Sequence, residues 1–516
     1  IILKEENKAF KVEKFEHTYP HCWRTDKPVL YYPLDSWFIK TTALKDKMVE
    51  TNRTINWKPE STGTGRFGNW LENLVDWNLS RSRYWGTPLP IWRTKDGKEE
   101  ICIGSIRQLK NEIAKAQKAG IQNPESKIKN LEDLHRPYVD EITLSSSTGQ
   151  PMFREPDLID VWFDSGAMPF AQVHYPFDYA QGKPLENQKL AYPADFISEA
   201  IDQTRGWFYT LHAIGVLMGR GKAYKNVICL GHLLDANGKK MSKSLGDVID
   251  PWTLIEKYGV DTLRLWMYSV NQPGESKNFD EKTVQILHNQ VFGLLYNVFA
   301  FYLLYRDESL EKEDLTLRPL LTGEGWERLN ILDQWILARL DELVELTTKN
   351  LDNYKLLEPT RAIRDFIGDL STWYLRRSRE RIKEGNKEAK QVLYFVLKTL
   401  SKIMAPFAPL GAEDIYLKLK NEKDPESVHL TKWTNNQLRI TNYELEILKN
   451  MEIVRKIVTL GLEVRQRANI KVRQPLFKLE IKNYELGIEY ADLIKEELNV
   501  KEVIENKNID TEILLD

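Results

Sequence analysis

Residues 240–246, Lys240-Met241-Ser242-Lys243-Ser244-Leu245-Gly246, are the most informative segment of this 516-residue chain. They follow a strand-like segment (Val227–Leu230) and a turn containing Gly238, so glycines allow the loop to bend at both ends. The ammonium groups of Lys240 and Lys243, with the hydroxyls between them, can surround one bound polyphosphate. A leaving pyrophosphate gains charge in the transition state, so cations placed here favour nucleotidyl transfer. The alternative is a solvated Lys/Ser loop.

The region around this segment alternates strand-like and helix-like pieces, which is typical of a parallel sheet covered by helices. We expect strands at Ile159–Phe163 and Val227–Leu230, and a long helix within Ala194–Gly219. Upstream, Ser61–Gly68 is expected to be a loop, and Trp70–Trp77 has helical spacing. This region is therefore predicted to be an α/β domain.

After about residue 280 the pattern changes to amphipathic helices, as at Leu332, Ile336 and Leu340. The tail returns to a mixed pattern, with strands expected at Leu476–Ile481 and Val500–Ile504 around a helix. The predicted fold class is thus α/β followed by an all-α bundle and a small mixed α/β tail.

Composition limits the class of protein. Lys and Arg number 73 against 75 Asp and Glu, a formal charge of -2, which excludes a uniformly basic nucleic-acid binder but not local basic patches. Hydrophobic residues make up 42%, as in globular proteins. Three cysteines exclude a disulfide scaffold and favour a reducing compartment. The apolar run Gly206–Met218 is too short to cross a bilayer, so we expect no membrane association.

A polar face is expected on the helix predicted within Ala194–Gly219. In a helix, positions i, i+3, i+4, i+7 and i+8 share one face. Acids on such a face suit an α-ammonium group or ribose hydroxyls, a glycine admits close approach, and an indole can wall an aliphatic pocket. The alternative is a polar stripe that faces solvent and binds no ligand. The residues on this face are Glu199, Asp202, Gln203, Gly206 and Trp207.

Residues 240–244 resemble the KMSKS signature of class I aminoacyl-tRNA synthetases, and the surrounding sequence is similar to the isoleucyl-tRNA synthetases in particular. Pro193–Phe208, with its DQTRGW run, resembles that family's active-site segment. Asp160–Gly166 is similar to its DSG segment, and Asp76–Gly86 to its SRxRxWG segment. The similarity continues through Ser427–Leu430 and Lys471–Leu476.

The resemblance implies a domain order. It places the exit of an editing insertion at residues 1–45 and the second half of a Rossmann-type catalytic domain at 46–250, with a surface insertion at about 100–155. A connecting, stem-contacting segment at 251–325 follows, then a helical anticodon-binding domain at 326–475 and a small α/β piece at 476–516.

The resemblance also implies roles for individual residues. Glu199 would contact the aminoacyl-adenylate, and Asp202 and Gln203, with Gly206 and Trp207, would help to hold it. Lys240 and Lys243 would stabilise the pyrophosphate. ATP would be bound by Lys243 with Ser242 and Ser244.

Two family features are missing from the sequence. No His-x-Gly-His or His-x-Gly-Asn motif occurs, and only the exit of an editing domain is recognisable, so we expect a fragment that is inactive alone. Cys22, Cys102 and Cys229 are scattered and cannot supply four tetrahedral ligands, so we expect no zinc.

A basic cluster in the helical region is a candidate contact for tRNA. Arginines suit phosphates, and neighbouring Trp373 and Tyr374 could stack on bases, although both aromatics lie at core spacing and burial is the stronger interpretation. Several arginines could simply cover the bundle surface. The arginines proposed for tRNA binding are Arg376, Arg377 and Arg379.

The resemblance thus implies the activity of an isoleucine–tRNA ligase, which would use ATP with Mg²⁺ to form isoleucyl-adenylate and transfer the isoleucyl group to tRNA(Ile). We expect a cytoplasmic monomer whose partners are tRNA(Ile), L-isoleucine and ATP. Two alternatives stay open. One is a valyl or leucyl enzyme, and the other is a non-catalytic tRNA-binding module derived from such an enzyme.

Overall fold

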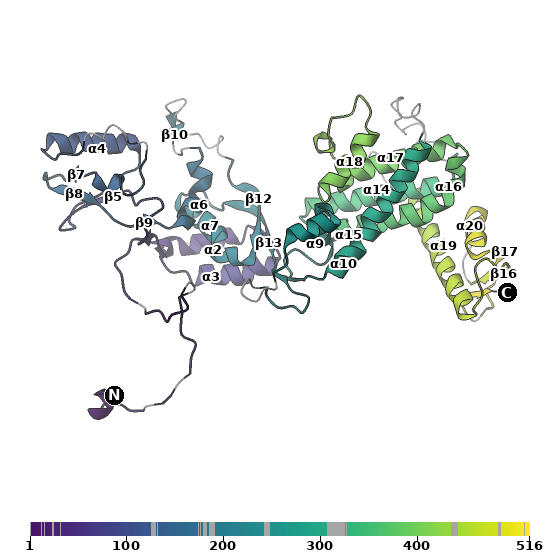
Figure 1. The fold of residues 1–516 in the computed structure, drawn as a ribbon, viewed down its shortest axis with the longest axis horizontal. Coiled ribbons are helices and arrows are strands. Elements are labelled where there is room, and N and C mark those ends of the chain that lie inside the picture. Colours follow the sequence, from purple (N-terminus) through teal and green to yellow (C-terminus); the bar gives the residue numbers. More distant parts are fainter. Residues whose placement is uncertain are drawn as a thin grey trace. The chain divides into compact units, whose positions relative to one another are not determined.

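The structure is a computed structural model of the 516-residue chain. It describes all residues except 1, 12, 15, 23–24, 31, 125–130, 132, 174, 176, 179–182, 185–190, 242–247, 307–325, 327, 435–441, 483–486, 510 and 516. The chain forms two compact units (Figure 1). Unit 1 comprises Ile1–Thr54, Phe67–Ala194 and Thr204–Ala223, and unit 2 comprises Ile55–Arg66, Asp195–Gln203 and Tyr224–Asp516.

Unit 2 begins with a small sheet in the order β12 (Ala194–Ala200), β13 (Tyr224–Leu230) and β2 (Asn56–Lys58). β13 and β2 pair in parallel, with Val227 opposite Trp57. Lys225 pairs with Asp195, and the Ser198 hydroxyl donates to the Ile228 carbonyl at 3.0 Å, so β12 runs in the same direction as β13. The predicted parallel sheet is therefore present, and Val227–Leu230 lies in its central strand.

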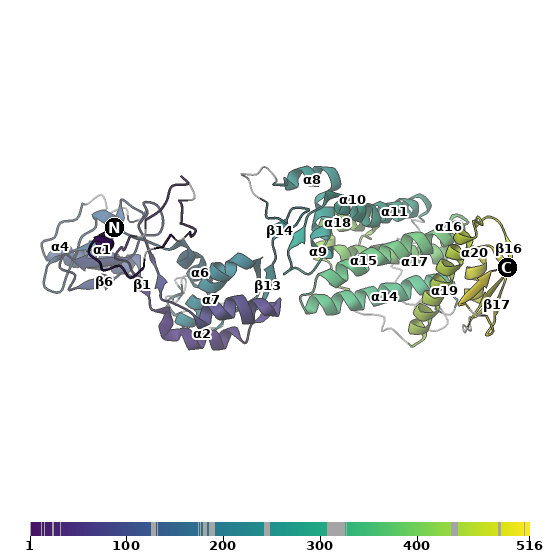
Figure 2. The same cartoon turned by 90° about the horizontal axis from the view of Figure 1, so that it is seen from below.

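Unit 1 packs four helices around an aromatic core: α2 (Lys45–Asn52), α3 (Gly68–Glu72), α6 (Val161–Ala171) and α7 (Trp207–Leu217). Trp70 and Trp77 both meet the ring of Tyr209 edge-on, with centroids about 6 Å apart. The α7 side chains from Phe208 to Val216 are all buried, so this helix is the centre of the unit (Figure 2 shows α7 beside α2).

Unit 1 also carries a small α/β module with its own core. Its antiparallel sheet has the order β6 (Glu100–Cys102), β5 (Ile91–Thr94), β8 (Pro151–Arg154), β7 (Leu144–Ser145), and α4 (Ile106–Lys118) packs on it. The Ser105 hydroxyl caps α4 by accepting from the Gln108 N–H. The core includes Trp92, Leu109 and Met152. The predicted surface insertion is thus a folded module.

Four expectations from the sequence are wrong. The helical spacing of Trp70–Trp77 holds only up to Glu72, where α3 ends, and Trp77 lies in a strand. Residues 61–68 are no open loop, since Thr62–Phe67 forms a π-helical turn (η2) that continues into α3. The strand expected at Ile159–Phe163 ends at Ile159, because Asp160 caps α6 there. The long helix expected within Ala194–Gly219 is a strand (β12), a 3-10 turn η5 (Ile201–Arg205) and then α7.

The remainder of unit 2 is largely helical, as predicted. α14, α15 and α17 form the centre of the bundle in both views (Figures 1 and 2), and their buried faces share one core. The helices and helical turns are α8 (Pro251–Tyr258), α9 (Val260–Ser269), α10 (Glu281–His288), η6 (Asn289–Gly293), α11 (Leu294–Tyr305), α14 (Ile331–Asp352), α15 (Leu357–Asp369), η7 (Leu370–Leu375), α16 (Arg376–Lys383), α17 (Lys387–Met404), α18 (Pro409–Leu419), η8 (Val428–Leu430) and α19 (Asn442–Arg467).

The helical run Glu281–Tyr305, unlike Gly206–Met218, is long and apolar enough to cross a membrane by length and composition, and 39% of its apolar window is buried. Its side chains Leu295, Val298 and Phe299 lie in the core of the bundle. In this structure the run is therefore a core element of unit 2.

The C-terminal piece has the predicted order of elements. β16 (Leu476–Ile481) pairs in parallel with β17 (Val500–Glu505) and antiparallel with β18 (Ile513–Leu515), and α20 (Ile488–Leu498) connects β16 to β17. The other short elements are α1 (Ile2–Glu5), β1 (Phe38–Ile39), η1 (Thr41–Leu44), β3 (Trp77–Asn78), β4 (Ser80–Arg81), η3 (Val139–Glu141), β9 (Leu158–Ile159), β10 (Phe177–Asp178), β11 (Lys183–Pro184), β14 (Leu233–Leu234) and β15 (Lys277–Asn278).

Candidate active site

The carboxyl ends of the parallel strands in unit 2 collect the predicted adenylate-binding acids. Glu199 is the last residue but one of β12 and is exposed. Asp202 is exposed on the turn that follows, and its carboxylate accepts from the Gln203 side-chain amide at 3.1 Å. Ligands of open parallel sheets bind outside this edge. The position fits a binding role for all three residues.

The geometry of these residues differs from the predicted helical face. Successive side chains alternate across β12, with Ile197 buried and Phe196 exposed, so Glu199 is not one helical turn away from Asp202. The strand forms because Ser198 and Asp195 pair with β13. Helical spacing therefore does not place Glu199, Asp202 and Gln203 on one face.

Gly206 and Trp207 belong to unit 1, where α7 begins at Trp207. The Trp207 indole N–H donates to the Ser165 carbonyl at 3.3 Å, within the DSG segment. Gly206 is buried directly before the helix. The indole thus joins two segments that the sequence analysis singled out separately.

A second pair of motif segments meets at Asp160 in unit 1. The carboxylate of this buried residue accepts from the Trp77 indole at 3.0 Å and from the Arg81 guanidinium at 2.7 Å, and it caps α6 through the Trp162 N–H. The Asp160 amide in turn donates to the Leu79 carbonyl at 2.7 Å. The DSG and SRxRxWG segments therefore form one polar junction, which spacing in the sequence could not show.

A hairpin leads into residues 240–246, and the structure describes it up to Met241. Lys240 bridges antiparallel to Leu234, and the Asp235 carboxylate accepts from the Asn237 and Lys239 amides. Gly238 adopts a φ of +77°, which a side chain would strain. Lys240 is exposed at the base of this hairpin. Ser242, Lys243 and Ser244 lie outside the described residues.

The hairpin is anchored by close packing at the end of β13. A Cβ atom on Gly231 would clash with the backbone of Glu275 and Ser276, and one on Gly274 would clash with the Pro59 ring. β14 then pairs in parallel with β15. Beside this junction Cys229 is buried, and burial raises the pKa of its thiol. These contacts fix the position of the hairpin that precedes residues 242–247.

The predicted tRNA-binding arginines have unequal surroundings. Arg377 pairs with both Glu496 and Glu497 of α20, and its side chain is only 9% exposed. Arg376 also pairs with Glu497, at 2.7 Å. Two of the three guanidinium groups therefore hold the C-terminal piece on the bundle, a role that the sequence did not indicate.

Arg379 differs from these two. It is exposed and lies over the Phe301 ring at 5.5 Å, and among the described residues no carboxylate pairs with it. Of the neighbouring aromatics, Tyr374 is fully buried and Trp373 partly so, as the core interpretation predicted.

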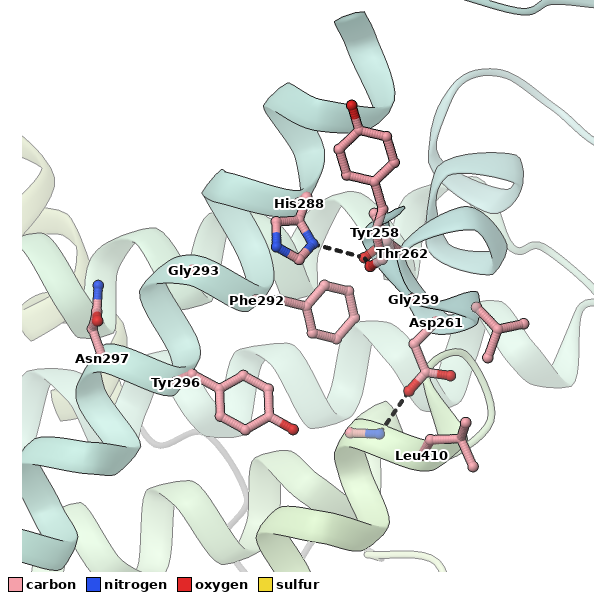
Figure 3. A pocket seen from close by; sticks show the side chains of 12 residues that line it. Tyr258, Gly259, Asp261, Thr262, His288, Phe292, Gly293, Tyr296, Asn297 and Leu410 are labelled. Atoms are coloured by element: carbon pink, nitrogen blue, oxygen red, sulfur yellow. Dashed lines mark hydrogen bonds between the residues drawn. The ribbon is translucent and has the colours of Figure 1, made fainter. Parts of the chain in front are cut away.

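A cavity of about 460 Å³ lies elsewhere in unit 2, and none of the predicted site residues lines it (Figure 3). Asp261 is 7% exposed and accepts from the Gly411 N–H at the start of α18 at 2.6 Å, while burial raises its pKa. The His288 ring bonds to the Thr262 hydroxyl at 3.0 Å (Figure 3). These polar contacts join α9 to α18 and α10, which favours a structural role for Asp261.

A metal site is not apparent in the described part of the chain, where no group of three or more His, Cys, Asp or Glu side chains could hold an ion. None of Cys22, Cys102 and Cys229 takes part in a disulfide. The absence of zinc stays a prediction.

Comparison with known proteins identifies two family profiles. The profile "tRNA synthetases class I (I, L, M and V)" matches residues 6–280, and "Anticodon-binding domain of tRNA ligase" matches residues 333–481. The isoleucine–tRNA ligase of Cytophaga hutchinsonii is 50% identical over 98% of this chain and 45% of its own length. That of Porphyromonas gingivalis is 48% identical over 98% of the chain and 45% of its length. The chain therefore spans about half the length of the curated relatives it matches.

Solved structures share the fold. A leucyl-tRNA synthetase of Agrobacterium radiobacter, in a ternary complex with tRNA, matches with a TM-score of 0.51 and 18% identity, covering 73% of this chain and 43% of that chain. A methionyl-tRNA synthetase of Mycobacterium tuberculosis, in complex with methionyl-adenylate, matches with a TM-score of 0.50 and 19% identity, covering 77% of this chain and 65% of that chain. At these identities the likeness concerns the fold alone.

Proposed function

The chain belongs to the class I tRNA synthetases, and from that membership we propose that it supplies the KMSKS and anticodon-binding regions of an isoleucine–tRNA ligase. The observation that carries the proposal is the 50% identity to an isoleucine–tRNA ligase across 98% of the chain. Relatives from Bacteroides and Clostridium with the same activity, at 47% and 44% identity, support the choice of isoleucine.

The proposed reaction has two steps. Isoleucine attacks the α-phosphate of ATP to give isoleucyl-adenylate and pyrophosphate, and the isoleucyl group then passes to the terminal ribose of tRNA(Ile). Lys240 and Lys243 would stabilise the pyrophosphate, with Ser242 and Ser244 as further ATP contacts. Positioning and charge stabilisation supply the catalysis, without a covalent enzyme intermediate.

The acids at the end of β12 suit the other end of the adenylate. An exposed Glu199 and the Asp202–Gln203 pair can accept hydrogen bonds from the α-ammonium group and the ribose hydroxyls. Gly206 and Trp207 keep the adenylate-binding role that the family resemblance implies. Because only one described partner, Gln203, holds the Asp202 carboxylate, its second oxygen is available to a ligand.

The proposed enzyme requires Mg²⁺ but no zinc, and it works in the cytoplasm. Mg²⁺ would arrive with ATP, and zinc would not be required because the three thiols lie apart in the sequence and no metal-binding group occurs among the described residues. Free cysteines suit the reducing cytoplasm, where we place the enzyme as a monomer.

A chimera tests the proposed activity. This chain would replace the matching segment of the Cytophaga ligase, and aminoacylation of tRNA(Ile) would be measured with isoleucine. We expect activity in the chimera, a loss of at least about 100-fold on Lys243→Ala, and near-normal activity on Lys239→Ala as the matched control. A soluble chimera that binds tRNA(Ile) but never forms the ester would contradict the proposal.

Binding by the 516-residue chain separates the alternatives. We expect the chain to bind tRNA(Ile) in preference to tRNA(Val) and tRNA(Leu), and to catalyse no ATP–pyrophosphate exchange alone. A preference for tRNA(Val) or tRNA(Leu) would favour the valyl or leucyl alternative. Preference for tRNA(Ile) combined with a chimera that is inactive in both steps would favour a non-catalytic binding module.

A further inference from the structure

The hairpin that carries Lys240 is attached to the segment of residues 271–279. β15, within this segment, pairs in parallel with β14, and the Lys277 amide donates to the His232 carbonyl at 2.8 Å. Leu234 of β14 in turn bridges antiparallel to Lys240. The position of Lys240 therefore depends on where the segment of residues 271–279 lies.

Hydrogen bonds within this segment hold its shape. The Lys277 ammonium group donates to the Asn271 side-chain oxygen at 2.5 Å and to the Gln272 carbonyl at 3.0 Å. The Glu275 carboxylate accepts from the Gln272 amide at 3.2 Å. Because these bonds close the loop on itself, a displacement of Gln272 would also displace Lys277 and with it β15.

Two side chains on the first turns of α15 hold the start of the segment. The Arg361 guanidinium donates to the Ser269 carbonyl at 3.0 Å and to the Val270 carbonyl at 2.8 Å, at the C-terminal end of α9. A cation is favoured at such unpaired helix carbonyls. The Glu358 carboxylate accepts from the Gln272 side-chain amide at 3.0 Å. α15 lies beside α9 in both views (Figures 1 and 2), and the two side chains, three residues apart, share one helix face.

Packing alone does not explain the glutamate at position 358. Its side chain is partly buried, and among the described residues its Oε2 is buried without a hydrogen-bond partner. A buried, unpaired carboxylate oxygen costs stability, so an apolar residue would suit the bundle better. The bond to Gln272 is what a glutamate adds at this position.

We propose that Glu358 and Arg361 are positioning residues for Lys240, which they hold in place through the end of α9 and β15. The inference rests on the proposed function for the role of Lys240 at the pyrophosphate. A cation stabilises a transition state when it is held where charge develops, and a displacement of about 1 Å can cost up to about 100-fold in rate. Both residues lie in the region that matches the anticodon-binding profile, whereas Lys240 lies in the region that matches the synthetase profile.

Hydrogen exchange of the 516-residue chain tests the contact without any assumption about activity. We expect Arg361→Ala to accelerate exchange in peptides covering residues 231–241 by about 10- to 100-fold, as the loss of a charge-assisted hydrogen bond does. Arg361→Lys keeps one donor and should show an intermediate rate. Arg364→Ala is the matched control on the same helix, because Arg364 forms its ion pair with the adjacent Asp365. Unchanged exchange in Arg361→Ala, an equal effect of Arg364→Ala, or an equal acceleration in α17 would overturn the proposal.

ATP–pyrophosphate exchange by the chimera with the Cytophaga ligase, without tRNA, tests the consequence for catalysis. We expect Arg361→Ala and Glu358→Ala to lower kcat/KM for pyrophosphate about tenfold and to leave the KM for isoleucine unchanged. Glu358→Gln keeps an acceptor for Gln272 and should restore most of the activity. In a Lys240→Ala background, Arg361→Ala should have little further effect, because it acts through Lys240.

The outcomes of the two experiments separate the positioning role from the proposed function. Equal losses on Arg361→Ala with and without Lys240→Ala, or a raised KM for isoleucine, would overturn the positioning role. An unaltered chimera that exchanges pyrophosphate with valine or leucine in preference to isoleucine would refute the isoleucine assignment alone. A chimera without any exchange would count against the proposed function, and hydrogen exchange of the 516-residue chain would still decide whether Arg361 holds the hairpin.

Discussion

Gly166 of α6 lies directly against Thr210 of α7. A Cβ atom on Gly166 would stand 2.8 Å from the carbonyl carbon of Thr210 and 2.9 Å from its Cβ. Backbone atoms cannot move aside as a flexible side-chain end could, so only glycine permits this helix crossing. The glycine of the DSG segment thus has a packing reason that is independent of any ligand.

Replacing Gly166 by alanine is expected to lower the free energy of unfolding of unit 1 by about 1–3 kcal/mol, the usual cost of overpacking. Gly368→Ala is the matched control, because a Cβ there meets nothing within 4 Å. Inside α15 that change should be neutral or stabilising by up to about 1 kcal/mol. Denaturant unfolding followed by fluorescence would check both. Equal effects of the two substitutions would contradict the packing argument.

The stability of unit 1 is expected to depend on pH through His212. Its ring is fully buried, bonded to the Met48 carbonyl at 2.9 Å, and burial lowers its pKa to about 4. Below its ordinary pKa of about 6.5 the unfolded chain binds a proton that the folded chain does not. Stability should therefore fall as the pH drops from about 6.5 to 4.

Melting temperatures measured across that range would check the expectation. His212→Gln keeps a donor for the Met48 carbonyl and should flatten the pH dependence of unit 1. His232→Gln changes an exposed imidazole and should leave the dependence unchanged. If the melting temperature of His212→Gln still falls between pH 6.5 and 4, the pH dependence arises from groups other than His212.

Asp341 on α14 is expected to destabilise the bundle at neutral pH. Burial and the nearby Glu444 raise its pKa to about 8, and its Oδ2 has no hydrogen-bond partner among the described residues. Because the folded state retains a proton that the unfolded state releases above about pH 4, stability should decline as the pH rises from about 4 to 8.

Asp341→Asn removes this titration. We expect it to stabilise unit 2 by about 1–3 kcal/mol at pH 8 and to reduce the slope between pH 4 and 8. Asp352→Asn, an exposed change on the same helix, is the control and should have little effect. Equal thermal shifts in the two variants at pH 8 would contradict the assignment.

Arg465 organises the C-terminal piece. Its guanidinium is 1% exposed and donates to four carbonyls, those of Lys471, Gln474, Leu498 and Asn499. Arg465→Ala would remove a donor from all four carbonyls, of which only the bond to Leu498 is fully buried, so we expect about 1–3 kcal/mol of local destabilisation. Hydrogen exchange in β16 and β17 should accelerate, while Arg467→Ala, 80% exposed on the same helix, should change nothing. Unaltered exchange in Arg465→Ala would disprove this role.

Arg379 and Arg377 are expected to have different roles. Arg379→Ala should weaken tRNA binding by about three- to tenfold and leave stability unchanged, as loss of a phosphate contact does. Arg377→Ala should instead destabilise the C-terminal piece, because it removes the ion pairs with Glu496 and Glu497. Filter binding and thermal unfolding of both variants would separate the two roles. If Arg379→Ala binds tRNA normally at low salt, that residue is not a contact.

The sequence predicted the fold class well where patterns were long. The amphipathic helices of the bundle and the strand–helix–strand order of the tail are confirmed by α14, α17 and β16–α20–β17. Long periodic segments carry this information locally. The family assignment also came from the sequence, because motifs such as residues 240–246 are contiguous.

Secondary structure predicted from residue spacing was wrong where pairing with a distant strand determined the conformation. Residues 194–206 have a helical arrangement of polar positions, yet Ala194–Ala200 forms a strand because β13 offers a pairing edge. Likewise, no pattern in the sequence reveals that Glu497 neutralises Arg376 and Arg377 across about 120 residues. Glu199, Asp202 and Gln203 thus lie on a strand and the turn after it and not on the predicted helix, and their binding roles stay predictions.

The sequence by itself determined the family and the fold class of the protein, because both depend on motifs and periodicities that are local in the chain. It also named candidate residues for the proposed chemistry, which stay predictions. Only the tertiary structure decided what each side chain faces. It buried Arg377 against two glutamates and left Trp85 open on a fixed histidine. Burial, charge pairing and stacking depend on segments distant in the sequence, and they exist only after those segments pack together.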